Sequence, residues 1–330
     1  MRAALCRALG LAALATAASA PLDRPGHLNS KTPYGARLDD RLSRAHEAAA
    51  GGQQQQCEAT ALYAVLRHGT RYPTAKDVRK MGAMGARVRV QPGRLPPRLG
   101  WLDGWTPPFP GEAEDGTLHD TGRREHHALA QRLQTAFPSL FPPAPDDPAY
   151  AFSATAKPRT QQSAQAFAAG LAGADVLTPD ALASLPHAAL GQDPLLRFHK
   201  MCPRYESSVK DNATLDRDAK GGDPSLLRRI VARRLGATLS AAGVTITPEE
   251  EGGEKVSAVD DKAMKAVWKV CQMEQLLQIP PERSDWCGLL SDDDILVMET
   301  LGDLDMYWEK GPGTPEPSGC CARQGLLGGV

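Results

Sequence analysis

The side chains of this sequence that are best suited to chemistry lie in one short stretch, Arg67-His68-Gly69-Thr70-Arg71-Tyr72-Pro73. Arginine presents a planar fork of N–H donors that matches the oxygens of a phosphate group. A neutral imidazole between two such forks can attack phosphorus and carry the phosphoryl group as a covalent intermediate. The stretch therefore predicts phosphoryl transfer, with His68 as the nucleophile and Arg67 and Arg71 as phosphate ligands. The alternative is a charged turn that binds no ligand.

A buried strand is expected to position this stretch. The apolar run from Thr60 to Leu66 directly precedes it and has the composition of a strand. Polar groups at the carboxyl end of such a strand lie where open α/β sheets bind ligands. Gly69 allows the backbone to approach a ligand closely, and Pro73 closes the turn.

A second segment repeats this arrangement of a strand followed by an arginine. Residues Ala149–Thr155 have the pattern of a strand, and Lys157-Pro158-Arg159 leads into a helix expected from about Thr160 to Leu171. The N-terminus of a helix contributes backbone N–H donors and the positive end of the helix dipole, which suits a bound anion. An ordinary arginine at a helix start is the alternative reading of Arg159.

The motif and its surroundings resemble the histidine acid phosphatases, in particular the branch of that family that acts on inositol polyphosphates. The likeness runs from about Tyr34 to Gly311 and is carried by Tyr34-Gly35 with Arg37, Leu62–Thr74, Gly116–Phe141, Lys157–Leu171 and Trp286-Cys287. The resemblance implies a phosphohistidine mechanism and inositol polyphosphates as substrates. It also implies an α/β core of the phosphoglycerate-mutase-like type with an inserted helical cap, and it makes Arg159 a third phosphate ligand.

The start of the chain has the pattern of a secretory signal peptide. Arg2 and Arg7 form a basic start, an apolar stretch follows, and Ala18-Ser19-Ala20 resembles a cleavage site. We expect the chain to divide into residues 1–20 as signal peptide, 21–56 as leader, 57–194 as the first part of the α/β core, 195–311 as a mainly helical cap, and 312–330 as an unrelated, disordered tail.

Cysteines and a glycosylation sequon agree with a secreted or endoplasmic reticulum product. No C-x-x-C pair occurs, which disfavours zinc ribbons and thioredoxin-type redox motifs and favours disulfides, with Cys271 and Cys287 as the pair that we expect. Asn212 begins an Asn-Ala-Thr acceptor sequon. Retention in the endoplasmic reticulum lumen and secretion both remain open.

Charge and hydropathy limit the classes of partner. The net charge of −1 argues against a dedicated nucleic-acid binder, and no run after the signal peptide is long and apolar enough to span a membrane. No cluster has metal-ligand spacing, and arginines can stabilise the phosphate charge, so we expect neither a metal nor a cofactor.

A basic segment follows the motif and has no acidic residue after Asp77. It contains Lys76, Arg79, Lys80, Arg87, Arg89, Arg94 and Arg98. Such a run is often a solvated face, but beside a phosphate motif it could also attract a polyanionic substrate. Lys76 and Arg79 lie nearest to the motif and are the first candidates for additional substrate contacts.

Helical patterns dominate the remaining segments. Asp120 or Thr121 is expected to cap a helix that runs to about Phe137, and the adjacent His126 and His127 on it are expected to face solvent. Further helices are expected from Pro224 to about Ala241 and from Val259 to Leu277. A capping box of Ser291 and Asp294 is expected to begin a last helix that runs to Lys310.

One feature of the resembled family is missing. Its reaction uses a histidine-containing motif in the second half of the chain as the proton donor, whereas no histidine follows His199 here. Gly311–Pro317 is a cluster of helix breakers. We therefore expect a truncated product that hydrolyses inositol phosphates poorly. The alternatives are a phosphate-binding fragment without turnover, or another acid phosphatase or bisphosphoglycerate phosphatase.

Overall fold

The computed structural model describes residues 27–28, 31, 59–141, 150–174, 192–193, 195–197, 200–205, 207, 224–247 and 259–310. The expected signal peptide, Asn212 and the tail from residue 312 lie outside these residues. The longer elements are α3 (Ala75–Gly85), β1 (Val88–Val90), α4 (Asp120–Ala136), α5 (Pro158–Leu171), α8 (Pro224–Ala241), β2 (Val244–Ile246), α9 (Asp261–Leu277) and α10 (Asp292–Lys310). Short helical segments are η4 (Pro97–Leu102), η5 (Glu112–Glu114), η6 (Pro138–Leu140), α6 (Pro203–Tyr205) and η9 (Cys287–Leu289).

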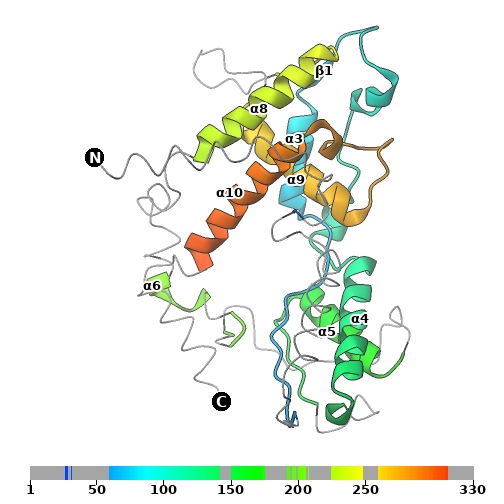
Figure 1. Cartoon of the computed structure of the whole chain (residues 1–330), viewed down its shortest axis with the longest axis vertical. Helices are drawn as coiled ribbons and strands as arrows, with labels where there is room; N and C mark the ends of the chain where they lie inside the picture. The colour runs from blue at the N-terminus through cyan, green and yellow to red at the C-terminus, as the bar shows by residue number, and fades with distance from the viewer. Residues whose placement is uncertain are drawn as a thin grey trace, which may run out of the picture.

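Helices α3, α8, α9 and α10 pack together in the upper part of Figure 1 and enclose the main core. Helix α9 is buried on several sides, with Met264, Val267 and Val270 among its fully buried side chains. Residues from α3 and from the segment 99–109 join the same apolar cluster. The main core therefore combines parts of the chain that lie far apart in sequence.

Local capping explains where two of these helices begin. Asp260 caps α9 by accepting a hydrogen bond from the backbone N–H of Ala263 at 2.7 Å. Ser291 and Asp294 form a reciprocal capping box at the start of α10, since the backbone N–H of each donates to the side chain of the other at 3.2 Å. The expected helices at α8, α9 and α10 are thus present with nearly the expected bounds.

A two-stranded antiparallel sheet borders the main core. Strands β1 and β2 pair with Val88 opposite Ile246 and Val90 opposite Val244. These strands were not predicted, because three-residue strands carry too little alternation to be recognised in sequence.

Helices α4 and α5 form a second packed unit, which we call the α4–α5 pair (Figure 1). Gly170 of α5 approaches α4 so closely that a Cβ atom there would lie 2.4 Å from the carbonyl oxygen of His127. The apolar cluster between the helices is small, with Ala130, Phe167 and Leu171 as its buried members. Close backbone approach therefore replaces a large apolar interface here.

The two expected strands beside the site are extended but are not paired as strands in the described residues. The run from Thr60 to Leu66 was expected to be buried, and this expectation is wrong: Tyr63 is 88% exposed and Val65 is 73% exposed. Residues 150–155 are likewise extended without a strand assignment. An apolar run becomes a buried strand only when neighbouring strands and helices cover it, and the described residues supply no such cover.

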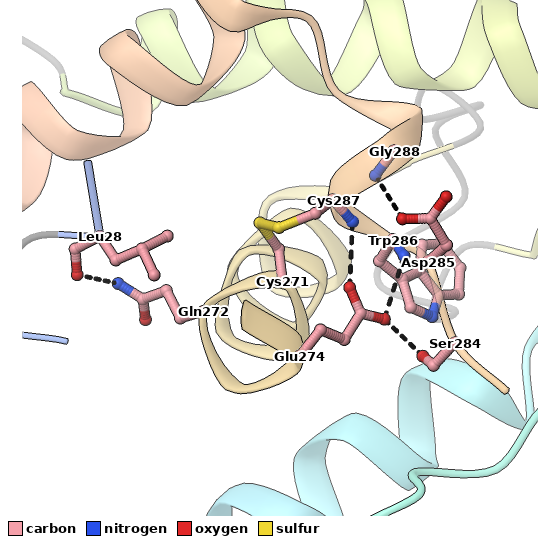
Figure 2. Close-up of a disulfide and its surroundings, with 9 residues drawn as sticks. All are labelled: Leu28, Cys271, Gln272, Glu274, Ser284, Asp285, Trp286, Cys287 and Gly288. Atoms are coloured by element: carbon pink, nitrogen blue, oxygen red, sulfur yellow. Dashed lines mark hydrogen bonds between the residues drawn. A yellow bond between two sulfur atoms is a disulfide. The ribbon is translucent and has the colours of Figure 1, made fainter. Parts of the chain in front are cut away.

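Figure 2 shows the disulfide that joins Cys271 of α9 to Cys287 of η9, the pair that was expected. Beside it, the carboxylate of Glu274 accepts hydrogen bonds from the backbone N–H groups of Trp286 and Cys287 at 3.0 and 3.1 Å. Burial raises the pKa of Glu274, while these hydrogen bonds act in the opposite direction. The disulfide and Glu274 together fix the segment after α9 onto the helix.

Candidate active site

His68 lies half-buried in a loop between the extended segment and α3. Its Nδ1–H donates to the carbonyl oxygen of Gly69 at 2.8 Å. This hydrogen bond places the proton on Nδ1, so the lone pair of the neutral ring is on Nε2. Burial is the main cause that lowers the pKa of His68 to about 4, and the nearby charges of Arg159, Arg67 and Arg71 add to this effect. The imidazole is therefore neutral and nucleophilic at neutral pH.

Arg71 and Arg159 converge beside Gly116. A Cβ atom on Gly116 would lie 3.5 Å from Nη1 of Arg71 and 3.8 Å from Nη1 of Arg159. The Nε atoms of both arginines are buried and have no hydrogen-bond partner among the described residues. Burial lowers the pKa of each guanidinium, and repulsion between the two adds to this in Arg71. Two closely spaced cations with unused donors suit a bound oxyanion.

Arg67 completes the set that the sequence predicted. Its charge contributes to lowering the pKa of His68, Arg71 and Arg159. Arg67, His68 and Arg71 line one cavity of about 270 Å³. The structure thus places the predicted nucleophile and two of the predicted phosphate ligands around one cavity, and Arg159 lies beside Arg71 at Gly116.

Helix α4 holds the loop in place through residues that sequence reasoning missed. The carboxylate of Glu125 accepts hydrogen bonds from the backbone N–H and from Oγ1 of Thr70, each at 2.7 Å. Gly122 lies directly against the loop, since a Cβ atom there would be 2.2 Å from the carbonyl oxygen of Thr70. The glycine in the first turn of α4 was the available sequence signal, because glycine inside a helix often marks close backbone approach.

The two histidines of α4 do not face solvent as expected. His126 is 7% exposed, and its Nε2–H donates to the carbonyl oxygen of Arg67 at 3.0 Å. His127 is partly buried, and its Nε2–H donates to the carbonyl oxygen of Ala174 at 2.9 Å. The expectation was wrong because α4 is covered on two sides, by the loop and by α5. The helix also starts one residue earlier than expected, with His119 as its N-cap.

Hydrogen bonds also fix the end of the loop where α3 begins. The backbone N–H of Tyr72 donates to the carbonyl oxygen of Thr117 at 3.0 Å. The backbone N–H of His119 donates to the carbonyl oxygen of Thr70 at 2.9 Å. The hydroxyl of Thr74 caps α3. The loop is therefore held at both ends, with His68 between α4 and α3.

The other predicted substrate residues lie elsewhere. Lys76 and Arg79 are exposed on α3 and are not among the residues that line the cavity around His68. The described part of the chain contains no group of three or more His, Cys, Asp and Glu side chains placed to hold a metal ion. No helix among the described residues is long and apolar enough to cross a membrane.

Comparison with known proteins agrees with this geometry. Residues 60–318 match the Histidine phosphatase superfamily (branch 2). The chain is 30% identical to Multiple inositol polyphosphate phosphatase 1 of Gallus gallus, over 83% of this chain and 56% of the relative, and 28% identical to the Homo sapiens protein of that name, over 78% and 52%. It is 23% identical to the Thiamine-repressible acid phosphatase pho4 of Schizosaccharomyces pombe, over 78% and 53%. The chain spans about half the length of these curated relatives. The match over most of the chain, together with the fold and the loop around His68, shows that this protein belongs to branch 2 of the histidine phosphatase superfamily.

Proposed function

We propose that this chain hydrolyses phosphate monoesters through a phosphohistidine at His68, with inositol polyphosphates as the substrate class. The observation that carries the proposal is the neutral imidazole beside three arginines, two of which have buried, unused Nε donors. A histidine whose Nδ1–H is held by the carbonyl of Gly69 presents Nε2 to an incoming phosphorus atom.

The reaction has two steps. First, Nε2 of His68 forms a bond to phosphorus while the bond from phosphorus to the ester oxygen breaks, and the leaving alkoxide takes up a proton from solvent water. Then the oxygen of a water molecule attacks phosphorus and gives up a proton to solvent, the phosphorus–nitrogen bond breaks, and inorganic phosphate leaves with His68 neutral again. Arg67, Arg71 and Arg159 hold the phosphate oxygens through both steps.

The names of two relatives support the substrate class, since both are inositol polyphosphate phosphatases. The arginine cluster supports it as well, because a substrate with several phosphates gains from a strongly positive site. We further propose entry into the secretory pathway, which rests on the pattern of Met1–Ala20 and on the disulfide between Cys271 and Cys287. The division at residues 194 and 311, and substrate contacts by Lys76 and Arg79, stay predictions.

The test is phosphate release by the purified chain from p-nitrophenyl phosphate and from inositol hexakisphosphate. We expect turnover of p-nitrophenyl phosphate that disappears in His68→Ala. His127→Ala is the matched control, because it removes a partly buried histidine of α4 that contacts Ala174 outside the site. Rapid quenching should trap an acid-labile phosphoprotein in the parent and none in His68→Ala. Equal activity in the parent and in His68→Ala would refute the proposal.

A second candidate is a phosphate-binding protein with little turnover of inositol phosphates. The observation that favours it is that no histidine follows His199 in the given sequence, whereas the family resemblance implies a proton donor in a later histidine motif. An inositol alkoxide leaves poorly without a proton, and general acid help is worth about 10²–10⁴-fold in rate. Turnover of p-nitrophenyl phosphate without release from inositol hexakisphosphate would favour this candidate. Release from both substrates would exclude it.

A further inference from the structure

His27 and Leu28, near the start of the chain, are anchored onto the main core. Leu28 is fully buried, and Nε2 of Gln272 on α9 donates to its carbonyl oxygen at 3.1 Å, as Figure 2 shows. His27 contacts Glu299 of α10, with Nδ1 and Oε2 2.6 Å apart. These contacts hold His27 and Leu28 against α9 and α10.

Lys31 lies in the wall of the cavity around His68. The backbone N–H of Lys31 donates to the carbonyl oxygen of Leu28 at 2.9 Å. Lys31 then lines the same cavity as Arg67, His68 and Arg71. A residue that lies 37 positions before the nucleophile in sequence is thus a neighbour of the motif.

Lys269 approaches the same place from α9. It precedes Gln272 by three positions, so the two side chains lie on neighbouring parts of one helix face, the face that carries Leu28. Lys269 is partly buried. Its charge lowers the pKa of Lys31, and the charges of Arg71 and Arg67 lower the pKa of Lys269. Lys269 is not itself among the residues that line the cavity, but Leu276, seven positions further along the same face of α9, is.

This cluster holds more positive charge than one phosphate requires. Burial, followed by repulsion from Arg71, Lys269 and Arg67, lowers the pKa of Lys31 to about 7. Among the described acidic groups, Asp77 acts in the opposite direction on both lysines. Cations held close together in a partly buried site raise the free energy of the protein without a ligand, and a bound anion relieves that repulsion.

We propose that Lys31 and Lys269 form a second anion subsite, which takes another phosphate of a polyphosphorylated substrate while Arg67, Arg71 and Arg159 hold the phosphate at His68. The assignment of the first phosphate rests on the proposed function, whereas the subsite itself is a claim about binding alone. The subsite gives substrates with several phosphates a higher affinity than substrates with one, because a single phosphate at His68 leaves the two lysines without a ligand.

The test is isothermal titration calorimetry of the full chain with inositol hexakisphosphate and, separately, with inorganic phosphate at the same ionic strength. The variants Lys31→Met and Lys269→Met remove the charge and keep a long unbranched side chain. We expect each to weaken binding of inositol hexakisphosphate about tenfold or more, as is typical for a lost charge-assisted hydrogen bond. Inorganic phosphate binding should fall much less. Lys31→Arg and Lys269→Arg should restore most of the affinity for inositol hexakisphosphate.

Lys265→Met is the matched control. Lys265 also lies on α9, but its side chain is 57% exposed and is paired with Asp261 at 2.7 Å. Unchanged affinity for inositol hexakisphosphate in Lys31→Met and Lys269→Met, or an equal loss in Lys265→Met, would overturn the subsite. If either outcome is found while the parent turns over p-nitrophenyl phosphate, the subsite is refuted and the proposed function stands. A parent without turnover that still loses inositol hexakisphosphate binding in the two variants supports the subsite and refutes the proposed function.

Discussion

The main core and the α4–α5 pair are held together by different means. The main core buries large apolar side chains such as Trp286, Met264 and Ile295 completely, and a disulfide joins Cys271 to Cys287 inside it. The α4–α5 pair has a small apolar cluster, and its contacts to the loop around His68 are polar or run through glycine. Apolar burial therefore stabilises the main core, whereas close fit and hydrogen bonding position the loop around His68.

This difference has a consequence for substitutions. Apolar packing stabilises in proportion to the area that it buries and tolerates changes of similar volume. A loop held by backbone contacts at Gly122 and by the carboxylate of Glu125 has no such tolerance, because each contact is specific in position. Changes in the main core should reduce stability, while changes at α4 should reduce activity and phosphate binding at nearly constant stability.

The largest effect should come from Gly122→Ala. The added Cβ would lie 2.2 Å from the carbonyl oxygen of Thr70, so the loop must move away from α4. A displacement of about 1 Å at a catalytic group costs on the order of 100-fold in rate, and we expect at least this loss in kcat/KM with p-nitrophenyl phosphate. Gly100→Ala is the control, since nothing lies within 4 Å of a Cβ there. Activity within twofold of the parent in Gly122→Ala would show that the loop does not depend on this contact.

Removal of the disulfide tests the other side of the comparison. Cys271→Ala with Cys287→Ala opens a loop with a sequence separation of 16 residues, and we expect the free energy of unfolding to fall by about 2–3 kcal/mol. Hydrogen exchange should become faster in α9 and η9 but not in α4 or α5. Equal acceleration in both units would mean that they unfold together and that the contrast between them has no bearing on stability.

Glu125 offers a smaller and more selective test. In Glu125→Ala the backbone N–H and the hydroxyl of Thr70 lose their shared acceptor, and phosphate affinity should fall about tenfold. Glu125→Gln keeps one acceptor oxygen, and the Thr70 hydroxyl can turn to accept from the amide, so its loss should be only a few-fold. Calorimetric titration with inorganic phosphate measures both. Melting temperatures should stay close to that of the parent, and a large drop would assign Glu125 to general stability instead.

The sequence predicted the parts of this protein that depend on local interactions. Helices α8, α9 and α10 follow from apolar periodicity and from caps such as Asp260 and the pair of Ser291 and Asp294. The set of His68 and three arginines followed from residue types in one motif and from a family likeness. The caps and the motif from Arg67 to Arg71 are signals within a few residues, whereas Arg159 was assigned from its place at a helix start and from the family likeness.

The parts that could not be predicted depend on contacts between distant segments. Glu125 and Thr70 are 55 positions apart, and Gln272 and Leu28 are 244 positions apart. Periodicity on one helix does not say which loop will lie against it, so His126 was expected in solvent although the loop covers it. The predicted burial of Thr60–Leu66 was wrong for the converse reason. An apolar composition predicts burial only if other segments pack on the run.

The finest test concerns the charge state of His68. Burial is the largest cause of its lowered pKa of about 4, and Arg159 contributes less. The imidazole should therefore stay neutral down to about pH 4, and the turnover step that needs its lone pair should fall only below that value. In the unfolded chain this histidine titrates near 6.5. The unfolded state thus binds more protons between these two pH values, and stability should decrease as the pH falls through this window.

Arg159→Met should raise the pKa of His68 only partly toward 6.5, since the burial of the ring remains. An NMR titration of the His68 ring measures both proteins, and a pKa near 6.5 in the folded parent would mean that the loop does not bury the ring.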